Sequence, residues 1–330
     1  MGLLQFAAVG NYKRFWNELK GLGEKTGRSP LLHLADTAVS TVLFGSGMQD
    51  YLNYHFYEKT FRERREYITI GWAAKFYKTT AKLEHAPFFS VKPNFHRNFA
   101  KYTKRAFFDP ESGAEALSDF LAKHPVFIYK PAIGLGGTDV QKLRAEDIGD
   151  ISAFLQKMRD EQAFAEELII QDEGWARLCP NSCNTVRVYT TACGGESEVI
   201  YAAARIGNGS SVADNFHSGG MTVAVDMENG LLVGTAFNAE REHFTAHPVT
   251  GTVFDGFQIP FWREALAMCR EAALVNDRVN VVGWDVAFTP SGPLLIEGNR
   301  GPGWDIVQIL SGCGRKDLLR PLMARLKKRR

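Results

Sequence analysis

Three oxygen-bearing side chains near the C-terminal end of the chain have the types and spacing of a metal site. Asp285 lies in the apolar run VGWDVAF, and Glu297 and Asn299 end the apolar run PLLIEGN. A carboxylate at the end of a buried strand is costly to desolvate unless a positive charge meets it. Two carboxylates and an amide oxygen suit Mg²⁺, because hard cations prefer oxygen ligands. The alternative is a pair of carboxylates neutralised by an arginine such as Arg300.

The two apolar runs must form a hairpin for these side chains to meet. The sequence TPSG, residues 289–292, is a typical turn between two strands. Side chains alternate along a strand, so Asp285, Glu297 and Asn299 share a face if an odd-length loop or a bulge pairs Asp285 with Glu297. We therefore expect this register, with one or two Mg²⁺ ions at the shared face.

A second candidate site surrounds the glycine-rich segment VFIYKPAIGLGGTDVQKL, residues 126–143. It matches neither GxxxxGK[ST] nor GxGxxG, so it is neither of the common phosphate loops. Gly134, Gly136 and Gly137 let backbone N–H groups approach a phosphate closely. The segment predicts a flap between two antiparallel strands, with Lys130 at the end of the first strand. The alternative is a plain glycine hairpin with an exposed lysine.

The elements that would position these residues indicate an α+β fold. Residues 1–105 read as mostly helical, and the rest mixes helices with strands joined by hairpins. The expected helices are 111–124, 146–164 and 262–277. The expected strands are 125–130, 167–171, 185–192, 198–206, 221–226, 231–237, 279–288 and 293–299.

Composition excludes several classes of protein. The net charge of +2, from 39 basic and 37 acidic residues, argues against nucleic-acid binding. No apolar run reaches the roughly 20 residues of a membrane span, and five cysteines without paired ligand spacing suggest reduced thiols. We expect a cytoplasmic protein with no membrane span and no zinc site.

Together the two candidate sites resemble the ATP-grasp superfamily, in which a lysine precedes a glycine-rich hairpin and a late strand pair supplies Asp and Glu-x-Asn. The segments DYLNYHFYEKTFRERREYIT, NTVRVYT and EGNRGPGWDIVQ are most similar to the sugar-transfer-associated ATP-grasp family. The resemblance implies an ATP-grasp fold, two α+β subdomains clasping ATP, with ATP and Mg²⁺ as cofactors. It implies a helical substrate-side cap at 1–105, a small subdomain at 106–175 and a large one at 176–330.

The resemblance also implies nucleotide-binding residues. Lys104 would be an earlier phosphate-binding lysine, with Lys101 as its rival. The backbone around Gln171 and Asp172 would contact adenine, and Glu173 or Glu167 would contact the ribose.

The remaining implied roles concern the reacting groups. Arg187 and Arg205 would bind anions, although a solvated strand face is the plainer interpretation of each. Asn215 and His217, in the segment DNFHSGGM, would lie near the acyl phosphate, and His217 is either a general base or a structural histidine. Arg300 would face the transferring phosphate and Asp305 the incoming amine.

The implied activity is an ATP-dependent, ADP-forming carboxylate–amine ligase that works through an acyl phosphate. The small-molecule acid and amine could belong to surface-polysaccharide or secondary metabolism, and the oligomeric state stays open, with a homodimer possible. The alternatives are a non-catalytic ATP-binding regulatory module and an ATP-grasp phosphotransferase or thiol ligase.

Overall fold

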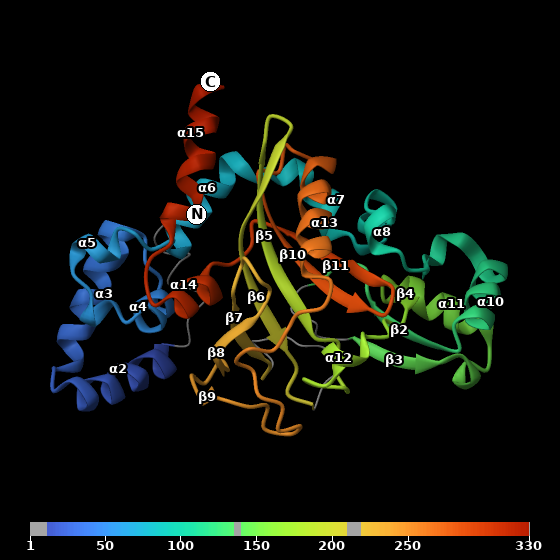
Figure 1. Cartoon of the computed structure of the whole chain (residues 1–330), viewed down its shortest axis with the longest axis horizontal. Helices are drawn as coiled ribbons and strands as arrows, with labels where there is room; N and C mark the ends of the chain where they lie inside the picture. Colours follow the sequence, from blue (N-terminus) through green and yellow to red (C-terminus); the bar gives the residue numbers. More distant parts are fainter. Residues whose placement is uncertain (1–11, 135–139, 210–218, 330) are drawn as a thin grey trace. The chain divides into compact units, whose positions relative to one another are not determined.

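The computed structural model describes residues 12–134, 140–209 and 219–329 (Figure 1). The chain divides into two compact units, the first containing the chain up to Thr80 and from Gly303 onward, the second Ala81–Pro302. These units do not coincide with the three segments expected from the sequence. Residues 81–105 belong with the strands, and the C-terminal residues belong with the N-terminal helices.

The first unit is helical, as the sequence predicts. Residues 30–80 form several short helices and not one long helix. Gly45, with a φ of 66°, ends one of them, and the capping box of Thr60 and Glu63 starts another. A cluster of buried side chains that includes Phe15, Leu19 and Tyr51 forms the core of this unit. The helices are α2 (Tyr12–Thr26), α3 (Pro30–Phe44), α4 (Met48–Asn53), α5 (Phe61–Arg64), α6 (Ile70–Thr80), α14 (Asp305–Ser311) and α15 (Arg320–Lys328).

The second unit contains a four-stranded antiparallel sheet of order β1-β4-β2-β3. Its strands are β1 (Phe107–Phe108), β2 (Val126–Pro131), β3 (Gln141–Arg144) and β4 (Ala163–Glu167). Helices α10 (Gly113–Lys123) and α11 (Ile151–Asp160) pack their apolar faces on it. Antiparallel pairing of β2 with β3 confirms that the glycine-rich segment connects two antiparallel strands.

One strand lies four residues earlier than expected. The predicted helix 146–164 ends at Asp160, and β4 occupies Ala163–Glu167 in place of the predicted strand 167–171. The side chain of Asp150 caps the start of α11, and Gln162, with a φ of 48°, turns the chain immediately before β4. The apolar periodicity misled the prediction because Ala163–Ala165 continue the apolar pattern of the helix. The consequence is that Glu166 lies within a sheet.

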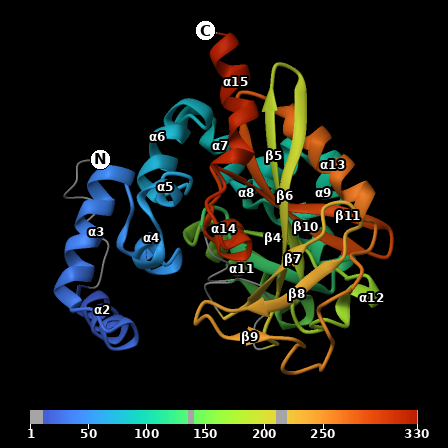
Figure 2. The same cartoon turned by 60° about the vertical axis from the view of Figure 1, so that its left-hand side comes forward.

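The larger sheet has seven strands in the order β11-β10-β5-β6-β7-β8-β9, all antiparallel, which confirms the expected meander and C-terminal hairpin (Figures 1 and 2). Helix α13 (Trp262–Val275) packs against this sheet. The short helices α7 (Ala86–Ser90), α8 (Lys92–Asn98), α9 (Ala100–Thr103) and α12 (Glu173–Ala176) complete the second unit. The strands are β5 (Thr185–Cys193), β6 (Glu196–Ile206), β7 (Met221–Val225), β8 (Leu232–Phe237), β9 (His243–Phe244), β10 (Val281–Thr289) and β11 (Gly292–Arg300).

Candidate active site

A row of charged side chains crosses neighbouring strands of the larger sheet. Asp285 on β10 pairs in register with Glu297 on β11 and with Arg187 on β5. The register shifts between Asp285 and Val286, so a bulge produces the pairing expected from the sequence. Side chains in register on adjacent strands lie on the same face. Asp285 and Glu297 therefore meet on one face, which confirms the expected register.

Two arginines neutralise Asp285. Arg187 Nε contacts Asp285 Oδ1, Arg187 Nη2 donates to Asp285 Oδ2 at 2.8 Å, and Arg205 Nη1 from β6 donates to the same oxygen at 3.0 Å. Burial alone would raise the pKa of Asp285, but Arg187 and then Arg205 outweigh it and hold the pKa well below its usual range. Arginine neutralisation, considered from the sequence as the alternative to metal binding, thus occurs at Asp285 with these partners.

Glu297 is neutralised less fully than Asp285, because the charge of Arg187 affects its pKa less than burial and the charge of Asp285 do. Desolvation of its carboxyl group, followed by the charge of Asp285, raises its pKa, and the two carboxyl groups share a hydrogen bond. Asn299 Nδ2 donates to Glu297 Oε1 at 2.9 Å, which leaves Asn299 Oδ1 as the atom able to face a cation. Gly298 allows this geometry, since a Cβ there would lie 2.7 Å from the Trp284 ring. Two carboxyl groups in contact form a position where a cation would be stabilised.

Arg300 does not join this group. It follows Asn299 by one residue, so its side chain leaves the opposite face of β11. Its Nη1 atom donates to the carbonyl oxygen of Ala81. The structure therefore does not bring Arg300 to the carboxylates or to the face where a phosphate was expected to bind.

A second charged cluster is buried in the four-stranded sheet, around Glu166 on β4. Lys130 Nζ lies 2.5 Å from Glu166 Oε1, Arg105 Nη1 lies 3.1 Å from the same oxygen, and His96 Nε2 lies 2.9 Å from Glu166 Oε2. Burial would raise the pKa of Glu166, but Arg105 and Lys130 outweigh it and hold the pKa well below its usual range. Burial lowers the pKa of His96 despite the opposing effect of Glu166. Lys130 lies near the end of β2, the strand before the glycine-rich segment, as expected, but it is part of a buried ion cluster and not an exposed lysine.

Arg105 is a cation that the sequence reasoning missed. Its side chain is 3% exposed, and beyond its ion pair with Glu166 its guanidinium nitrogens have no hydrogen-bond partner among the residues that the structure describes. The two lysines considered from the sequence point elsewhere, since Lys104 Nζ donates to Pro293 O at 3.2 Å and Lys101 Nζ to Glu271 Oε2 at 2.6 Å. Neither is brought to Lys130. Nothing in the sequence around Arg105 indicated that it is buried, because its burial depends on the placement of β4.

Lys92 on α8 connects the two clusters electrostatically. Its ammonium group donates to Pro131 O at 3.0 Å and to Gly134 O at 3.3 Å, at the base of the glycine-rich segment. Burial and the charge of Lys130 lower the pKa of Lys92, whereas Glu297 and Glu166 raise it. Lys92 therefore lies within electrostatic reach of both clusters. The sequence reasoning missed it because nothing in KPNFHRN, read alone, distinguishes it from a surface lysine.

The residues expected to bind adenosine have structural contacts. Gln171 accepts from Asn184 N at 2.8 Å, and the amide of Asp172 donates to Phe288 O at 2.8 Å. The Asp172 side chain caps α12, Glu173 is exposed, and Glu167 accepts from the amide that follows Arg105. The amide of Asp172 is thus already engaged, and the adenosine roles of this segment remain predictions.

Several predicted residues lie outside the part of the chain that the structure describes: Gly136, Gly137, Asn215 and His217. Asp305 begins α14 in the first unit, so its proposed contact with an amine also stays a prediction. Within the described ranges no group of three or more His, Cys, Asp or Glu converges as a metal centre. The candidate metal site thus depends on two carboxyl groups and the amide oxygen of Asn299.

Replacing Lys130 by Met is expected to weaken ATP binding by about 1.5–3 kcal/mol, roughly ten- to hundredfold in Kd, through loss of a charge-assisted contact. Isothermal titration calorimetry measures the effect. The fold should survive because Arg105 and His96 still contact Glu166. Because Lys130 is buried beside Glu166, we expect some loss of stability as well.

Lys101→Met is the matched control, because Lys101 is exposed and pairs with Glu271 away from the cluster. It should leave both ATP affinity and the melting temperature nearly unchanged. An equal loss of affinity in the two variants would assign the phosphate contact to Lys101.

The free energy of unfolding is expected to fall as the pH is lowered below about 4, the unfolded-state pKa of a carboxyl group. Glu166 and Asp285 have pKa values below that value in the folded protein. Their stabilisation is complete above the unfolded pKa and is lost as the pH falls through the folded pKa. Urea unfolding at pH 7, 4 and 3 measures this loss. Equal stability at the three pH values would contradict it.

Comparison with known proteins confirms the resemblance drawn from the motifs. Residues 97–323 match the family model described as sugar-transfer associated ATP-grasp, which is more than half of the chain. The matched residues include both charged clusters apart from Lys92 and His96. No curated protein sequence matches.

Solved structures with a similar arrangement include several ligases. The ATP-grasp ligase PsnB, solved with a phosphomimetic variant of its minimal precursor, Mg and ADP, is 16% identical, with a TM-score of 0.46 over 84% of this chain and 73% of that chain. The D-alanine–D-alanine ligase from Coxiella burnetii is 10% identical, with a TM-score of 0.40 over 76% of this chain and 64% of that chain. D-cycloserine synthetase DcsG is 15% identical, with a TM-score of 0.40 over 73% and 70%.

Proposed function

The chain belongs to the sugar-transfer associated ATP-grasp family, and we propose that it is an ATP-dependent ligase that joins a carboxylate to an amine. The observation that carries the proposal is that helix α8 borders both charged clusters: His96 contacts Glu166 at 2.9 Å, and the ring of Phe95 lies beside Gly298, the residue next to Glu297. A carboxylate face suited to a divalent cation and a cationic cluster suited to phosphates thus both adjoin one helix of the second unit.

The cations of the second cluster would hold the phosphates of ATP. Lys130 and Arg105 are both buried beside Glu166, which orients them and offsets part of their charge. Arg105 has guanidinium nitrogens without hydrogen-bond partners, and an incoming phosphate would satisfy them. Lys92 would approach the same phosphates from the base of the glycine-rich segment.

The residues of the first cluster fit a magnesium ion by the chemistry of their donors. Glu297 and Asp285 share a hydrogen bond, which requires a proton between the two carboxyl groups, and the pKa of Glu297 is raised, so a bound cation would take the place of that proton. Glu297, Asp285 and Asn299 Oδ1 would hold the ion, with Arg187 keeping Asp285 in place. Bound there with ATP, Mg²⁺ would neutralise charge on the phosphates.

The chemistry we propose has two steps. A carboxylate oxygen of the acid attacks the γ-phosphorus of ATP, the bond between that phosphorus and the β–γ bridging oxygen breaks, and ADP leaves. The amine nitrogen then attacks the carbonyl carbon of the acyl phosphate, inorganic phosphate leaves with the bonding pair, and the amine loses a proton. Arg187 and Arg205 lie on the face where the phosphate would develop its charge.

Hydroxylamine trapping tests this function directly. The full-length protein would be incubated with Mg-ATP and panels of amino acids, uronic acids and sugar acids, and release of ADP and phosphate would be measured. An acid that is activated should give a hydroxamate when hydroxylamine replaces the amine. Phosphorylation of a hydroxyl group or formation of a thioester would favour a phosphotransferase or a thiol ligase instead. ATP binding without turnover on any panel would favour a regulatory module.

A further inference from the structure

Helix α3 in the first unit has its apolar side chains on the outside. Its buried residues are polar: His33, Thr37 and Ser40. Its aliphatic residues are 41% to 74% exposed, namely Leu31, Leu32, Leu34, Val39, Val42 and Leu43. At about 100° per residue the two sets occupy opposite halves of the helix. A surface helix of a globular protein normally has the reverse arrangement, so α3 is inverted.

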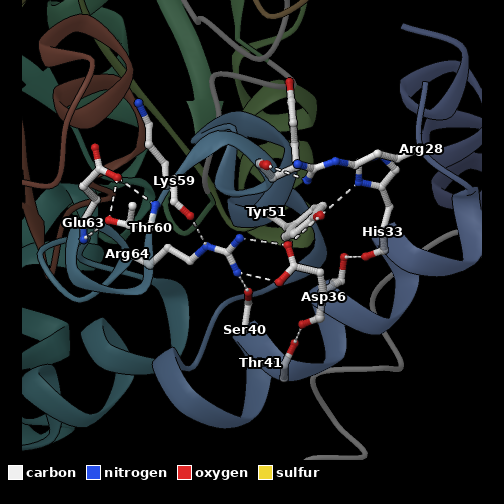
Figure 3. Close-up of polar contacts among 12 residues, drawn as sticks. Arg28, His33, Asp36, Ser40, Thr41, Tyr51, Lys59, Thr60, Glu63 and Arg64 are labelled. Carbon is white, nitrogen blue, oxygen red and sulfur yellow. Dashed lines mark hydrogen bonds and ion pairs between the residues drawn. The ribbon is translucent and has the colours of Figure 1, made fainter. Parts of the chain in front are cut away.

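The inward orientation of the polar half is fixed by a buried arginine (Figure 3). Arg64 on α5 donates to the two carboxylate oxygens of Asp36 at 2.6 and 2.8 Å and to Ser40 Oγ at 2.9 Å. Its guanidinium also lies 5.6 Å from the centroid of the Phe56 ring. Turning α3 to bury its aliphatic half would leave this buried charge without its partner, which is strongly unfavourable.

Three further hydrogen bonds hold the same half of the helix. Tyr51 donates its hydroxyl hydrogen to Asp36 Oδ2 at 3.1 Å, and His33 Nδ1 lies 3.1 Å from that hydroxyl oxygen (Figure 3). The other ring nitrogen of His33 lies 2.9 Å from Thr26 Oγ1, at the end of α2. The outward position of the aliphatic half is therefore specified by the contacts of the inward half.

The exposed patch is large and uncharged. The six aliphatic side chains lie on one 15-residue helix, which is about 22 Å long. Together they expose on the order of 600 Å² of apolar surface, which is at the upper end of the range of areas found for the largest apolar patch of a monomeric protein. Phe61, 50% exposed, extends the patch, with its ring centroid 5.8 Å from that of Phe44. Such a patch marks a surface that binds something apolar.

Charge in the first unit indicates the partner. Residues 1–80 and 303–330 hold 19 Lys and Arg against 9 Asp and Glu, a formal charge of +10, whereas residues 81–302 hold 20 against 28, a charge of −8, giving +2 in total. Helix α2, which packs against α3 (Figure 2), carries exposed basic side chains at Lys13, Arg14, Lys20 and Lys25. An apolar helix face in a cationic unit complements an anionic lipid surface.

The same charge argues against two other partners. Two copies meeting through α3 would bring two units of charge +10 together, and their repulsion would oppose association. Nucleic acid would contact the basic side chains but would leave the aliphatic half of α3 in water.

We propose that the first unit docks on an anionic bilayer through α3, with the helix parallel to the membrane plane. Leu31, Leu32, Val42 and their neighbours enter the boundary between headgroups and acyl chains, and the basic side chains of α2 contact the headgroups. The helix lies on the bilayer and does not cross it. Within the described residues no helix is long and apolar enough to span a membrane. This inference does not depend on the proposed ligase activity.

Vesicle co-sedimentation of the full-length protein tests the docking. We expect binding to vesicles of phosphatidylcholine with phosphatidylglycerol, at least tenfold weaker binding to phosphatidylcholine alone, and weaker binding at high salt. Val42→Glu should reduce affinity for the anionic vesicles at least tenfold. Val249→Glu is the matched control, because Val42 is 74% and Val249 70% exposed and the two lie in different units. Its affinity should equal that of the wild type.

Circular dichroism melts show whether the variants fold. If Val42→Glu does not fold, Leu31→Gln is used in its place. The proposal is overturned if the folded wild type binds no anionic vesicles, or if a folded α3 variant binds them as well as Val249→Glu does. A wild-type dimer that Val42→Glu makes monomeric, without vesicle binding, would assign the face to a second copy of the chain. If the wild type is a monomer and binds no vesicles, the aliphatic face of α3 would bind another part of the chain or another protein instead.

Discussion

Replacing Glu297 by Gln is expected to lower ATP turnover at least about a hundredfold while the fold is kept. The carboxyl group of Glu297 already has a raised pKa beside Asp285, so a neutral side chain of the same shape resembles its state without a cation. Gln also removes a like charge from the pair. The melting temperature should therefore equal or exceed that of the wild type, and turnover of the true substrates should fall.

A binding measurement separates loss of the metal site from other causes of low activity. In the wild type, Mg²⁺ should strengthen nucleotide binding, and in Glu297→Gln this gain should be lost. Glu271→Gln is a suitable control, because Glu271 is an exposed carboxylate that pairs with the exposed Lys101 and not with Asp285. Normal ATP turnover in Glu297→Gln with the true substrates would contradict the metal assignment and favour the arginine-neutralised alternative.

Replacing Glu166 by Gln is expected to destabilise the protein by about 3–5 kcal/mol, the cost of breaking a buried ion pair from one side. Lys130 and Arg105 are nearly buried, with side chains 8% and 3% exposed, and both depend on this one carboxylate. Without the Glu166 carboxylate, Lys130 and Arg105 would be two buried cations that have lost their shared partner. Urea unfolding at pH 7 measures the difference in free energy of unfolding between the wild type and Glu166→Gln. This difference should be smaller at pH 3, because the wild type loses the contribution of Glu166 in acid.

Glu167→Gln is the matched control for this prediction. Glu167 is the next residue on β4, points to the other face, and accepts one hydrogen bond from Ala106 N at 3.0 Å. An amide oxygen can accept the same hydrogen bond, so the loss of stability should be small. A Glu166→Gln protein as stable as Glu167→Gln would show that the cluster is not held by charge.

The sequence by itself determined which residues of the carboxylate site share a face, and it determined most of the elements. Strand alternation, the TPSG turn and the parity of Asp285, Glu297 and Asn299 were enough to predict their shared face, because a hairpin is a local structure whose register depends on a few neighbouring residues. The glycine-rich segment between antiparallel strands, the meander and helix α13 followed from local patterns for the same reason.

Only the tertiary structure decided which cations meet which anions. Arg105 and Lys92 gained their positions from β4 and α8, and β4 itself was misplaced because its alanines continue the apolar pattern of α11. Arg187 and Arg205 could be assigned to one face from the sequence, but their pairing with Asp285 needed three strands in register.

Helix α3 is the clearest case of an orientation that only the tertiary structure decided. The aliphatic half of a surface helix is normally buried, but the orientation of α3 is reversed because Arg64, 28 residues from Asp36 along the chain, holds the polar half inward. Contacts between residues far apart in the sequence have energies that no local pattern contains.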